Sequence, residues 1–148
     1  MSAANSCVFC SIINRSLNAA IVFDGNFFLA IMDKYPITNG HVLVIPKNHY
    51  DTLLDMNNDE VGKLYSLVRV ISKSVVNSFN ANGFNIGQNN GKCANQIVPH
   101  VHVHIIPRFN NDSPDGKWPT RTVANDNELI QHSDKIKKFL NHDLLSKF

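Results

Sequence analysis

The stretch His100-Val101-His102-Val103-His104-Ile105-Ile106 places three imidazoles at every second position, with aliphatic side chains between them. Alternation with a period of two is typical of a β-strand, in which successive side chains point to opposite faces. We therefore expect the three rings on one face of a strand and the aliphatic side chains on the other. Three buried imidazoles would be poor core material without polar partners. The pattern predicts a strand whose polar face lines a functional cleft.

Two kinds of chemistry use a row of imidazoles. The rings can bind a metal, or one ring can attack an electrophile while its neighbours orient it and neutralise charge. A solvated strand that is merely rich in histidine is the third interpretation. The sequence favours the first two, because three of the seven histidines in the chain stand in strict alternation.

The composition indicates one folded domain in a reducing setting. A chain of 148 residues, 43% of them hydrophobic, suffices for a single core. The formal net charge of +2, carried by dispersed basic residues, argues against a nucleic-acid surface. We expect no membrane span, since no apolar run approaches the ~20 residues that one needs. The three cysteines and the lack of a signal-peptide pattern favour a cytoplasmic protein with free or metal-bound thiols.

The chain predicts an α+β fold with five strands, joined mostly by short turns, in an antiparallel sheet. The expected strands cover residues 21–23, 27–32, 41–45, 84–87 and 100–106. Asp24-Gly25 predicts a tight hairpin turn with positive backbone angles between the first two. The turn-prone Gln88-Asn89-Asn90-Gly91 follows the fourth.

Two helices complete the predicted fold. Helical spacing of apolar residues predicts a helix over residues 57–77, and Asn57 with Glu60 resembles a capping box at its start. A loop marked by Ser113-Pro114-Asp115-Gly116 is expected over residues 110–120. A final helix is expected over residues 127–145, with an inward-facing set that comprises Leu129, Ile136, Leu140 and Leu144. Trp118, in the loop, is interpreted as peripheral packing or as a cover for the functional cleft or an interface.

Cys7-Val8-Phe9-Cys10 is a second candidate site. Two thiolates with this spacing can bind one tetrahedral zinc if two more ligands come from elsewhere. His49 and one histidine of the alternating row are the natural candidates, because Cys93 stands alone in a polar loop. A metal-free dithiol is the alternative, although the strand-to-helix context of redox motifs is absent.

Taken together, these motifs resemble the histidine-triad (HIT) superfamily. The resemblance runs from Cys7 to Arg108 and rests on four segments: Cys7-x-x-Cys10, Gly40-His41-Val42-Leu43-Val44-Ile45-Pro46-Lys47-x-His49, Asn89-Asn90-Gly91 and Gln96-x-Val98-x-His100-Val101-His102-Val103-His104-Ile105-Ile106-Pro107-Arg108. It implies a HIT-like homodimer, each subunit with a five-stranded antiparallel sheet, a long helix and a C-terminal helix. Residues 1–148 would form a single HIT domain, with its core over about residues 7–108 and the loop and C-terminal helix over 109–148.

The resemblance implies chemistry at the α-phosphorus of a purine nucleotide, through a covalent nucleotidyl-histidine. His102 would be the nucleophile and His104 would contact the phosphoryl oxygens. Gln96 would lie near the scissile bridge, Asn89 would reach the phosphate, and Asp33 would accept hydrogen bonds from the ribose hydroxyls. From the residues alone, Asp33 and Asn89 can equally be turn residues, and His41 can be a plain strand-end residue.

Zinc-containing relatives, bacterial and archaeal members among them, imply a metal site as well. The ligands would be Cys7, Cys10, His49 and His100, and the zinc would be structural. Three positions depart from the family pattern: Ile97 stands where a hydroxyl is frequent, Asn95 replaces a frequent glycine, and Lys34 replaces an apolar residue that contacts the base.

The sequence therefore predicts a HIT-type hydrolase or transferase that acts on a nucleoside phosphoramidate, an acylated nucleotide or a dinucleoside polyphosphate. A zinc-dependent hydrolase that uses the triad as metal ligands is one alternative, and a purine-nucleotide-binding module with little turnover is the other. The leaving group, the base and the cellular role are not encoded in these motifs.

Overall fold

The computed structural model of the chain describes residues 7–113, 115 and 117–148. Residues 1–6, 114 and 116 lie outside the described residues, and the last two belong to the turn predicted within the 110–120 loop. Across the described ranges, no helix is long and apolar enough to cross a membrane.

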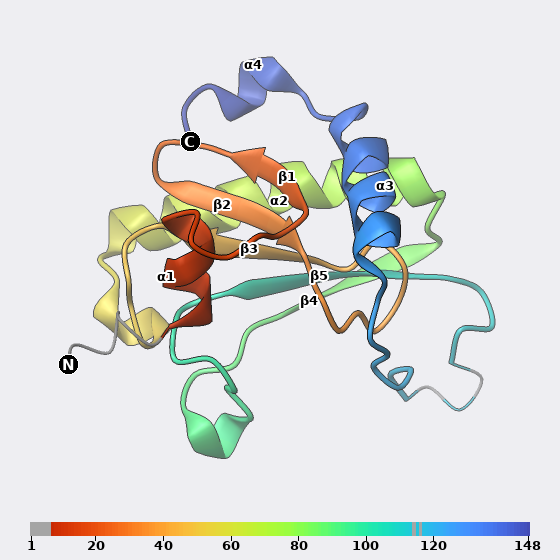
Figure 1. The fold of residues 1–148 in the computed structure, drawn as a ribbon, viewed down its shortest axis with the longest axis horizontal. Coiled ribbons are helices and arrows are strands. Elements are labelled where there is room, and N and C mark those ends of the chain that lie inside the picture. Colours follow the sequence, from red (N-terminus) through yellow and green to blue (C-terminus); the bar gives the residue numbers. More distant parts are fainter. Residues whose placement is uncertain (1–6, 114, 116) are drawn as a thin grey trace.

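A five-stranded antiparallel sheet organises the fold (Figure 1), which confirms the predicted α+β class. Its strands are β1 (Ile21–Asp24), β2 (Phe28–Met32), β3 (Val42–Pro46), β4 (Gly83–Gly87) and β5 (Val103–Arg108). Their spatial order is β1-β2-β3-β5-β4, so β4 and β1 are the edges of the sheet. Strand β5, which carries His104, thereby lies between β3 and β4, away from either edge.

The two faces of the sheet pack differently. Helix α2 (Asn58–Phe79) covers one face, where Val44 and Val103 are fully buried opposite each other. The short helix α1 (Val8–Ile13) covers the other face (Figure 1) and packs on Leu29, Leu43 and neighbouring side chains. Leu43 pairs with His104, so the imidazole of His104 shares the α1 face. Packing on the α2 face thus leaves the opposite face for polar chemistry.

The predicted triad strand is correct in direction but starts later than expected. Strand β5 begins at Val103, so His100 and His102 precede it. The reason is a change of hydrogen-bond partner: the Val101 N–H donates to the carbonyl of Tyr50 at 2.7 Å, in the loop after β3, instead of to a strand. The rings nevertheless follow one another on one side, and the centroids of His102 and His104 are 5.0 Å apart.

The first hairpin forms, but its predicted turn geometry is wrong. Gly25 does not adopt a positive φ, because the connection to Phe28 is longer than a two-residue turn. A Cβ atom on Gly25 would lie 2.7 Å from both the Phe23 ring and the carbonyl oxygen of Phe148. Close approach of the chain's last residue, rather than the backbone angle, therefore requires glycine there.

Helix α2 matches its prediction closely. The Asn57 side chain accepts from the Glu60 N–H at 2.9 Å, and its amide donates to the Glu60 carboxylate at 2.7 Å. The first of these bonds satisfies a backbone donor that a helix start otherwise leaves unpaired, and the second holds the capping side chain in place. Val68, Ile71 and Val75 are fully buried, as the helical spacing predicted.

The prediction of a single C-terminal helix over residues 127–145 is wrong. The structure has two helices there, α3 (Asp126–Lys137) and α4 (His142–Leu145). The chain breaks because the Asn141 side chain caps the Leu144 N–H at 3.2 Å and starts a new helix. The break changes the helical phase, so Leu145 is buried and Leu144, predicted to face inward, is 43% exposed.

Three short helices within the described residues were not predicted. They are α1 and the 3₁₀ turns η2 (Leu53–Asp55) and η3 (Lys92–Ala94). Each is at most six residues long, too short for a helical period to stand out in the sequence.

Gly40, just before β3, generates a stability prediction. Its φ is +91°, and a Cβ atom there would lie 2.8 Å from the ring of Phe79. We expect Gly40→Ala to lower the free energy of unfolding by about 2 kcal/mol or more, since both backbone and packing oppose a methyl group. Gly62→Ala, in the open on α2, is the matched control and should stabilise by about 0.5–1 kcal/mol. Chemical denaturation measures the free energy of unfolding of both variants, and equal changes would contradict the proposed requirement for glycine at position 40.

Candidate active site and metal centre

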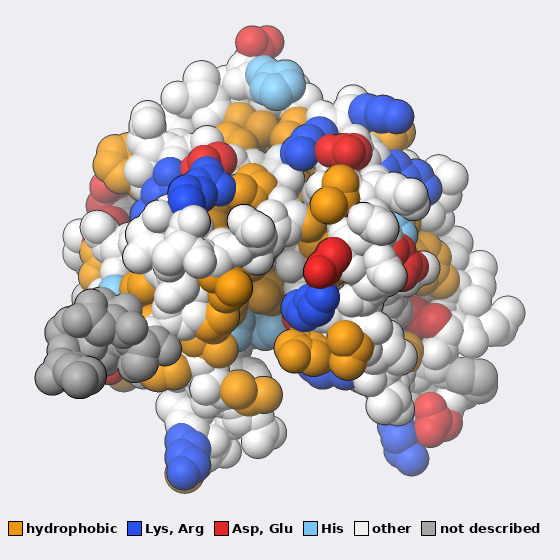
Figure 2. Space-filling model, viewed as in Figure 1, with side chains coloured by type: hydrophobic (Ala, Val, Ile, Leu, Met, Phe, Trp, Pro, Cys, Tyr) orange, Lys and Arg blue, Asp and Glu red, His pale blue; other side chains and the backbone are white. Residues whose placement is uncertain are grey.

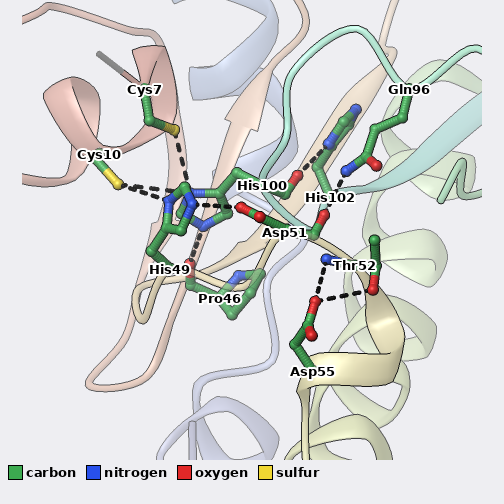
Figure 3. Close-up of polar contacts among 10 residues, drawn as sticks. All are labelled: Cys7, Cys10, Pro46, His49, Asp51, Thr52, Asp55, Gln96, His100 and His102. Atoms are coloured by element: carbon green, nitrogen blue, oxygen red, sulfur yellow. Dashed lines mark hydrogen bonds and ion pairs between the residues drawn. The ribbon is translucent and has the colours of Figure 1, made fainter. Parts of the chain in front are cut away.

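Four predicted metal ligands come together from three separate parts of the chain. Cys7 and Cys10 lie at α1, His49 follows β3, and His100 precedes β5 (Figure 3). Cys7 Sγ is 3.4 Å from His100 Nδ1, and Cys10 Sγ is 3.3 Å from His49 Nδ1. All four potential ligand atoms lie within 4.8 Å of one another.

Hydrogen bonds leave Nδ1 of both histidines free to accept. His100 Nε2 is 2.8 Å from the carbonyl oxygen of Pro46, which can only accept, so Nε2 carries the proton. His49 Nε2 is 2.9 Å from the carboxylate of Asp51, which fixes the same tautomer in the neutral ring. An imidazole held in this way by a carbonyl or a carboxylate is a typical metal ligand.

The donor set fits a tetrahedral zinc. Ordinary Zn–S and Zn–N bond lengths put sulfur and nitrogen about 3.6 Å apart on a tetrahedron edge. Cys10 Sγ is 3.3 and 3.6 Å from Nδ1 of His49 and His100. Burial lowers the pKa of His100 to about 4, which keeps the ring neutral. Burial and the neighbouring Cys7 raise the pKa of Cys10 to about 11, so its thiol would need a cation to ionise at neutral pH.

His102 presents the opposite nitrogen. Its Nδ1 is 2.7 Å from the carbonyl oxygen of His100, so Nδ1 donates and Nε2 carries the lone pair (Figure 3). Burial lowers the pKa of His102, against the opposing effect of that backbone bond. The ring also packs on Phe9, with centroids 5.0 Å apart. A neutral imidazole with a bare, fixed Nε2 is equipped to attack an electrophile.

A hydrogen-bonded relay sets the proton on His104. The Ile37 N–H donates to His41 Nδ1 at 3.1 Å, so the proton of His41 lies on Nε2. His41 Nε2 is 2.9 Å from His104 Nδ1, which must therefore accept. His104 keeps its own proton on Nε2 and can donate it to a ligand. Burial lowers the pKa of His41 to about 4, and burial with the neighbouring imidazoles lowers that of His104 to about 3.

This relay argues against a metal among Asp33, His41 and His104, although their ligand atoms also lie within 4.8 Å of one another. A metal there would need the lone pair of His41 Nε2, and the Ile37 N–H leaves a proton on that nitrogen. The two clusters therefore differ. In the cysteine–histidine cluster, the free nitrogen lone pairs face the thiols, whereas in the Asp33 cluster the histidine nitrogens are hydrogen-bonded to one another and to the backbone.

Asp33 is buried beside the relay. Its Oδ2 is 3.4 Å from His41 Nε2 and 2.9 Å from Nη1 of Arg121, while its Oδ1 accepts from the Tyr35 N–H at 2.9 Å. Arg121 also donates to the Tyr35 carbonyl at 2.6 Å. Both carboxylate oxygens of Asp33 thus have protein partners.

The other two predicted binding residues hold the loop after β4. The Gln96 side chain accepts from the Gly91 N–H and donates to the Asp51 carbonyl, both at 2.6 Å. Asn89 donates to the Asn95 carbonyl at 3.1 Å. Figure 3 shows the Gln96 amide at the Asp51 carbonyl. Each amide nitrogen retains a second N–H that can meet a ligand.

The three departures from the family pattern have distinct outcomes. Asn95 takes a left-handed φ of +62°, which asparagine tolerates, so the backbone that a glycine would adopt is retained. Ile97 is 90% exposed and offers no hydroxyl. Lys34 forms an ion pair with Asp126 at the start of α3.

Several residues of the site escaped the sequence analysis. The sequence motifs assign no role to Phe9, and they leave open whether His41 is more than a strand-end residue. Arg121 carried no local signal, because its partner Asp33 lies 88 residues away and only the fold reveals that the two side chains meet. Asp51 lies only two residues from its partner His49. The spacing of Asp51 two residues after His49 was the one clue available.

A hollow opens over the imidazoles. Figure 2 shows it between two lobes of the molecule, with histidine side chains at its floor and hydrophobic and basic side chains on its rim. A cavity of about 840 Å³ lies between the loops after β3 and after β4. Its lining comprises Asp51, Thr52, Gly91, Lys92, Asn95, Gln96, Ile97 and Pro99. Its volume is in the range of small-molecule sites.

The fold and this histidine-lined site define a known class of protein. A family model for the HIT domain matches residues 14–111. The chain therefore belongs to the HIT domain family, which confirms the resemblance found in its motifs.

Relatives of the chain carry several activities in their names. An uncharacterized HIT-like protein of Saccharolobus solfataricus is 40% identical over 106 residues, which are 72% of this chain and 76% of that protein. Arabidopsis thaliana adenylylsulfatase HINT3 is 39% identical over 134 residues, 90% of this chain and 64% of that protein. The adenosine 5'-monophosphoramidase hnt1 of Schizosaccharomyces pombe is 32% identical over 120 residues, 80% of this chain and 87% of that protein.

A solved structure is similar over nearly the whole chain. The crystal structure of a Zn-bound histidine triad family protein from Mycobacterium smegmatis superposes with a TM-score of 0.81 at 32% sequence identity. The match covers 98% of this chain and 99% of that one.

Proposed function

We propose that this protein is a hydrolase or transferase that acts at the α-phosphate of purine nucleotide conjugates through a covalent nucleotidyl-His102 intermediate. The observation that carries the proposal is the bare Nε2 of His102, fixed by the 2.7 Å bond from its Nδ1 to the His100 carbonyl. Relatives named adenosine 5'-monophosphoramidase and adenylylsulfatase support nucleotide hydrolysis as the reaction class.

In the first step, the lone pair of His102 Nε2 attacks the α-phosphorus. An N–P bond forms as the bond from phosphorus to the leaving group breaks, and the leaving group takes up a proton from solvent. The backbone bond to the His100 carbonyl holds the Nδ1 proton and stabilises the cationic ring of the intermediate. Preorganised donors matter most where charge accumulates on the phosphoryl oxygens. The Nε2–H of His104 is such a donor, and the relay from His41 keeps it in that tautomer.

In the second step, water attacks the phosphorus and the N–P bond breaks. The electron pair returns to His102 Nε2, the water loses a proton to solvent, and the mononucleotide leaves. An alcohol or phosphate in place of water would make the reaction a transfer. The spare N–H groups of Gln96 and Asn89 and the carboxylate of Asp33 would position the substrate, with Asp33 at the ribose.

The substrate would be a nucleoside phosphoramidate, an acylated nucleotide or a dinucleoside polyphosphate. The cavity beside Gln96 offers room for the leaving group of each. An alternative in which the triad binds a catalytic metal is disfavoured by the geometry. His100 Nδ1 faces the thiols, His102 Nδ1 donates to a carbonyl and His104 Nδ1 faces His41, so these three nitrogens have separate partners.

Mass spectrometry after brief exposure to adenosine 5'-phosphoramidate or adenylyl sulfate tests the intermediate. We expect a mass increase of one adenylyl group, localised to His102. His102→Asn should remove the adduct and lower turnover by about a thousandfold or more, because no other lone pair is aimed at the phosphorus.

His104→Asn is the matched variant: it should keep the adduct and slow its formation by roughly ten- to a hundredfold, since one oxyanion donor is lost. Undiminished turnover in His102→Asn would refute the intermediate. Turnover that a chelator abolishes, with no adduct, would favour a metal hydrolase, and nucleotide binding without turnover would favour a binding module.

We further propose a structural zinc held by Cys7, Cys10, His49 and His100. The fit of the four ligand atoms and the zinc-bound relative support it. The ion would cross-link α1 to the segments before α2 and before β5, and the chemistry would remain with His102. A cytoplasmic setting, which keeps thiols reduced, agrees with three cysteines that are free of disulfides.

Metal analysis of the purified protein tests this site. We expect about one zinc per subunit, and Cys10→Ser should lose it and lower Tm by roughly 5–10 °C, because bound metal stabilises only the folded state. Cys93→Ser, at an exposed position away from the cluster, is the control and should keep both. Zinc in fewer than about half of the wild-type subunits would argue against a permanent ion.

We also propose that two copies form a homodimer through β4. The outer edge of β4 has unpaired backbone groups, and edges of this kind pair readily with a second strand. The side chains of Phe84 and Ile86, on the face of β4 that α2 also covers, are 47% and 44% exposed. A second copy, related by a twofold axis, would pair β4 with β4 and cover both side chains.

Light scattering after gel filtration tests the dimer. Phe84→Glu should weaken association by about a hundredfold, since it buries a charge at the proposed interface. Leu54→Glu, which changes an apolar side chain that is 92% exposed elsewhere, is the control and should leave the dimer intact. A monomeric wild-type protein at micromolar concentration would contradict the proposal.

A further inference from the structure

Arg121 reaches the relay from outside the part of the chain that the HIT model matches, which ends at residue 111. Its Nη1 lies 2.9 Å from Oδ2 of Asp33. The same oxygen is 3.4 Å from His41 Nε2 and 3.8 Å from His104 Nδ1. One carboxylate oxygen therefore separates the guanidinium from the two imidazoles of the relay.

The charges of this cluster balance. His41 and His104 are neutral at pH 7, because burial lowers the pKa of each to about 4 and about 3. Asp33 contributes one negative charge, and its side chain is only 8% exposed. Among the described residues, Arg121 is the one lysine or arginine within ion-pair distance of Asp33. Without it, the cluster beneath the donor nitrogen of His104 would carry an uncompensated negative charge.

Such a charge would oppose the ligand proposed for this site. A nucleotide phosphate is an anion, and a buried carboxylate a few ångströms away repels it with little solvent screening. We propose that Arg121 is a positioning residue that neutralises Asp33 so that the hollow accepts an anionic phosphate beside His104. The inference deepens the proposed function and rests on it.

Fastening of the C-terminal segment does not account for this contact. The Thr122 and Ala124 N–H groups already donate to the carbonyls of Pro36 and Lys34, at 3.3 and 3.1 Å. The ion pair of Lys34 with Asp126 adds a further link. These links, with the bond from Arg121 to the Tyr35 carbonyl at 2.6 Å, hold the segment along residues 34–36. The ion pair with Asp33 is not needed for that fastening, and through it Arg121 brings a positive charge to the relay.

The experiment compares AMP with adenosine, which share base and ribose and differ in the phosphate. The readout is the ratio of the two dissociation constants, measured by calorimetry or by NMR titration. Arg121→Gln should weaken AMP binding by about tenfold or more and change adenosine binding by less than about twofold, because only the charged ligand senses Asp33. Arg121→Lys should retain most of the AMP preference.

Two further variants separate charge from structure. Asp33→Asn combined with Arg121→Gln removes both charges and should restore the wild-type ratio to within about threefold. Asp126→Asn releases the surface link of the same segment and should leave the ratio unchanged.

An unchanged ratio in Arg121→Gln would overturn the inference, and so would equal weakening of both ligands or a double variant no better than Arg121→Gln. A wild-type protein that binds AMP no better than adenosine would overturn it too. The proposed reaction is tested separately, by the adduct at His102.

Discussion

A backbone carbonyl oxygen can only accept a hydrogen bond and a backbone N–H can only donate one, and this constraint determines which ring nitrogens of His41, His100, His102 and His104 carry a proton. The carbonyls of Pro46 and His100 fix the protons of His100 and His102 on opposite ring nitrogens. The Ile37 N–H does the converse for His41 and, through it, for His104. Chemically identical side chains thereby expose different ring nitrogens, as the proposed tasks of metal ligand, nucleophile and donor require.

The backbone can impose these tautomers because the segment before β5 leaves the sheet. Strand pairing would use the His100 carbonyl in a ladder, whereas this segment bonds instead to Pro46, at the end of β3, and to Tyr50, in the loop that follows. Helix α1 then closes over the rings, with Phe9 against His102. A zinc at the cysteines would tether that helix and so maintain the packing of the proposed nucleophile.

The sequence predicted the sheet and the long helix well, since their signals are local. Period-two alternation, Asn57 with Glu60 and the buried spacing of α2 each act within a few residues. The predictions failed where a cap or a distant contact overrides such signals. Asn141 interrupts the C-terminal helix by capping its own new turn, and Gly25 is required by the approach of Phe148 rather than by a turn angle. Trp118, for which the sequence left several roles open, is half-exposed and lies near Gly87.

The sequence by itself determined the family, because residue type and short spacing suffice to specify an alternating row or a CxxC pair. The resemblance carried by these motifs then supplied the candidate nucleophile and the candidate zinc ligands. Only the tertiary structure decided which nitrogen of each ring is free and which charges meet at Asp33. Those properties depend on partners up to 93 residues apart, such as Cys7 and His100. Hydrogen bonds and ion pairs form between atoms that are close in space, and no pattern along the chain records which distant atoms the packing brings within 3 Å.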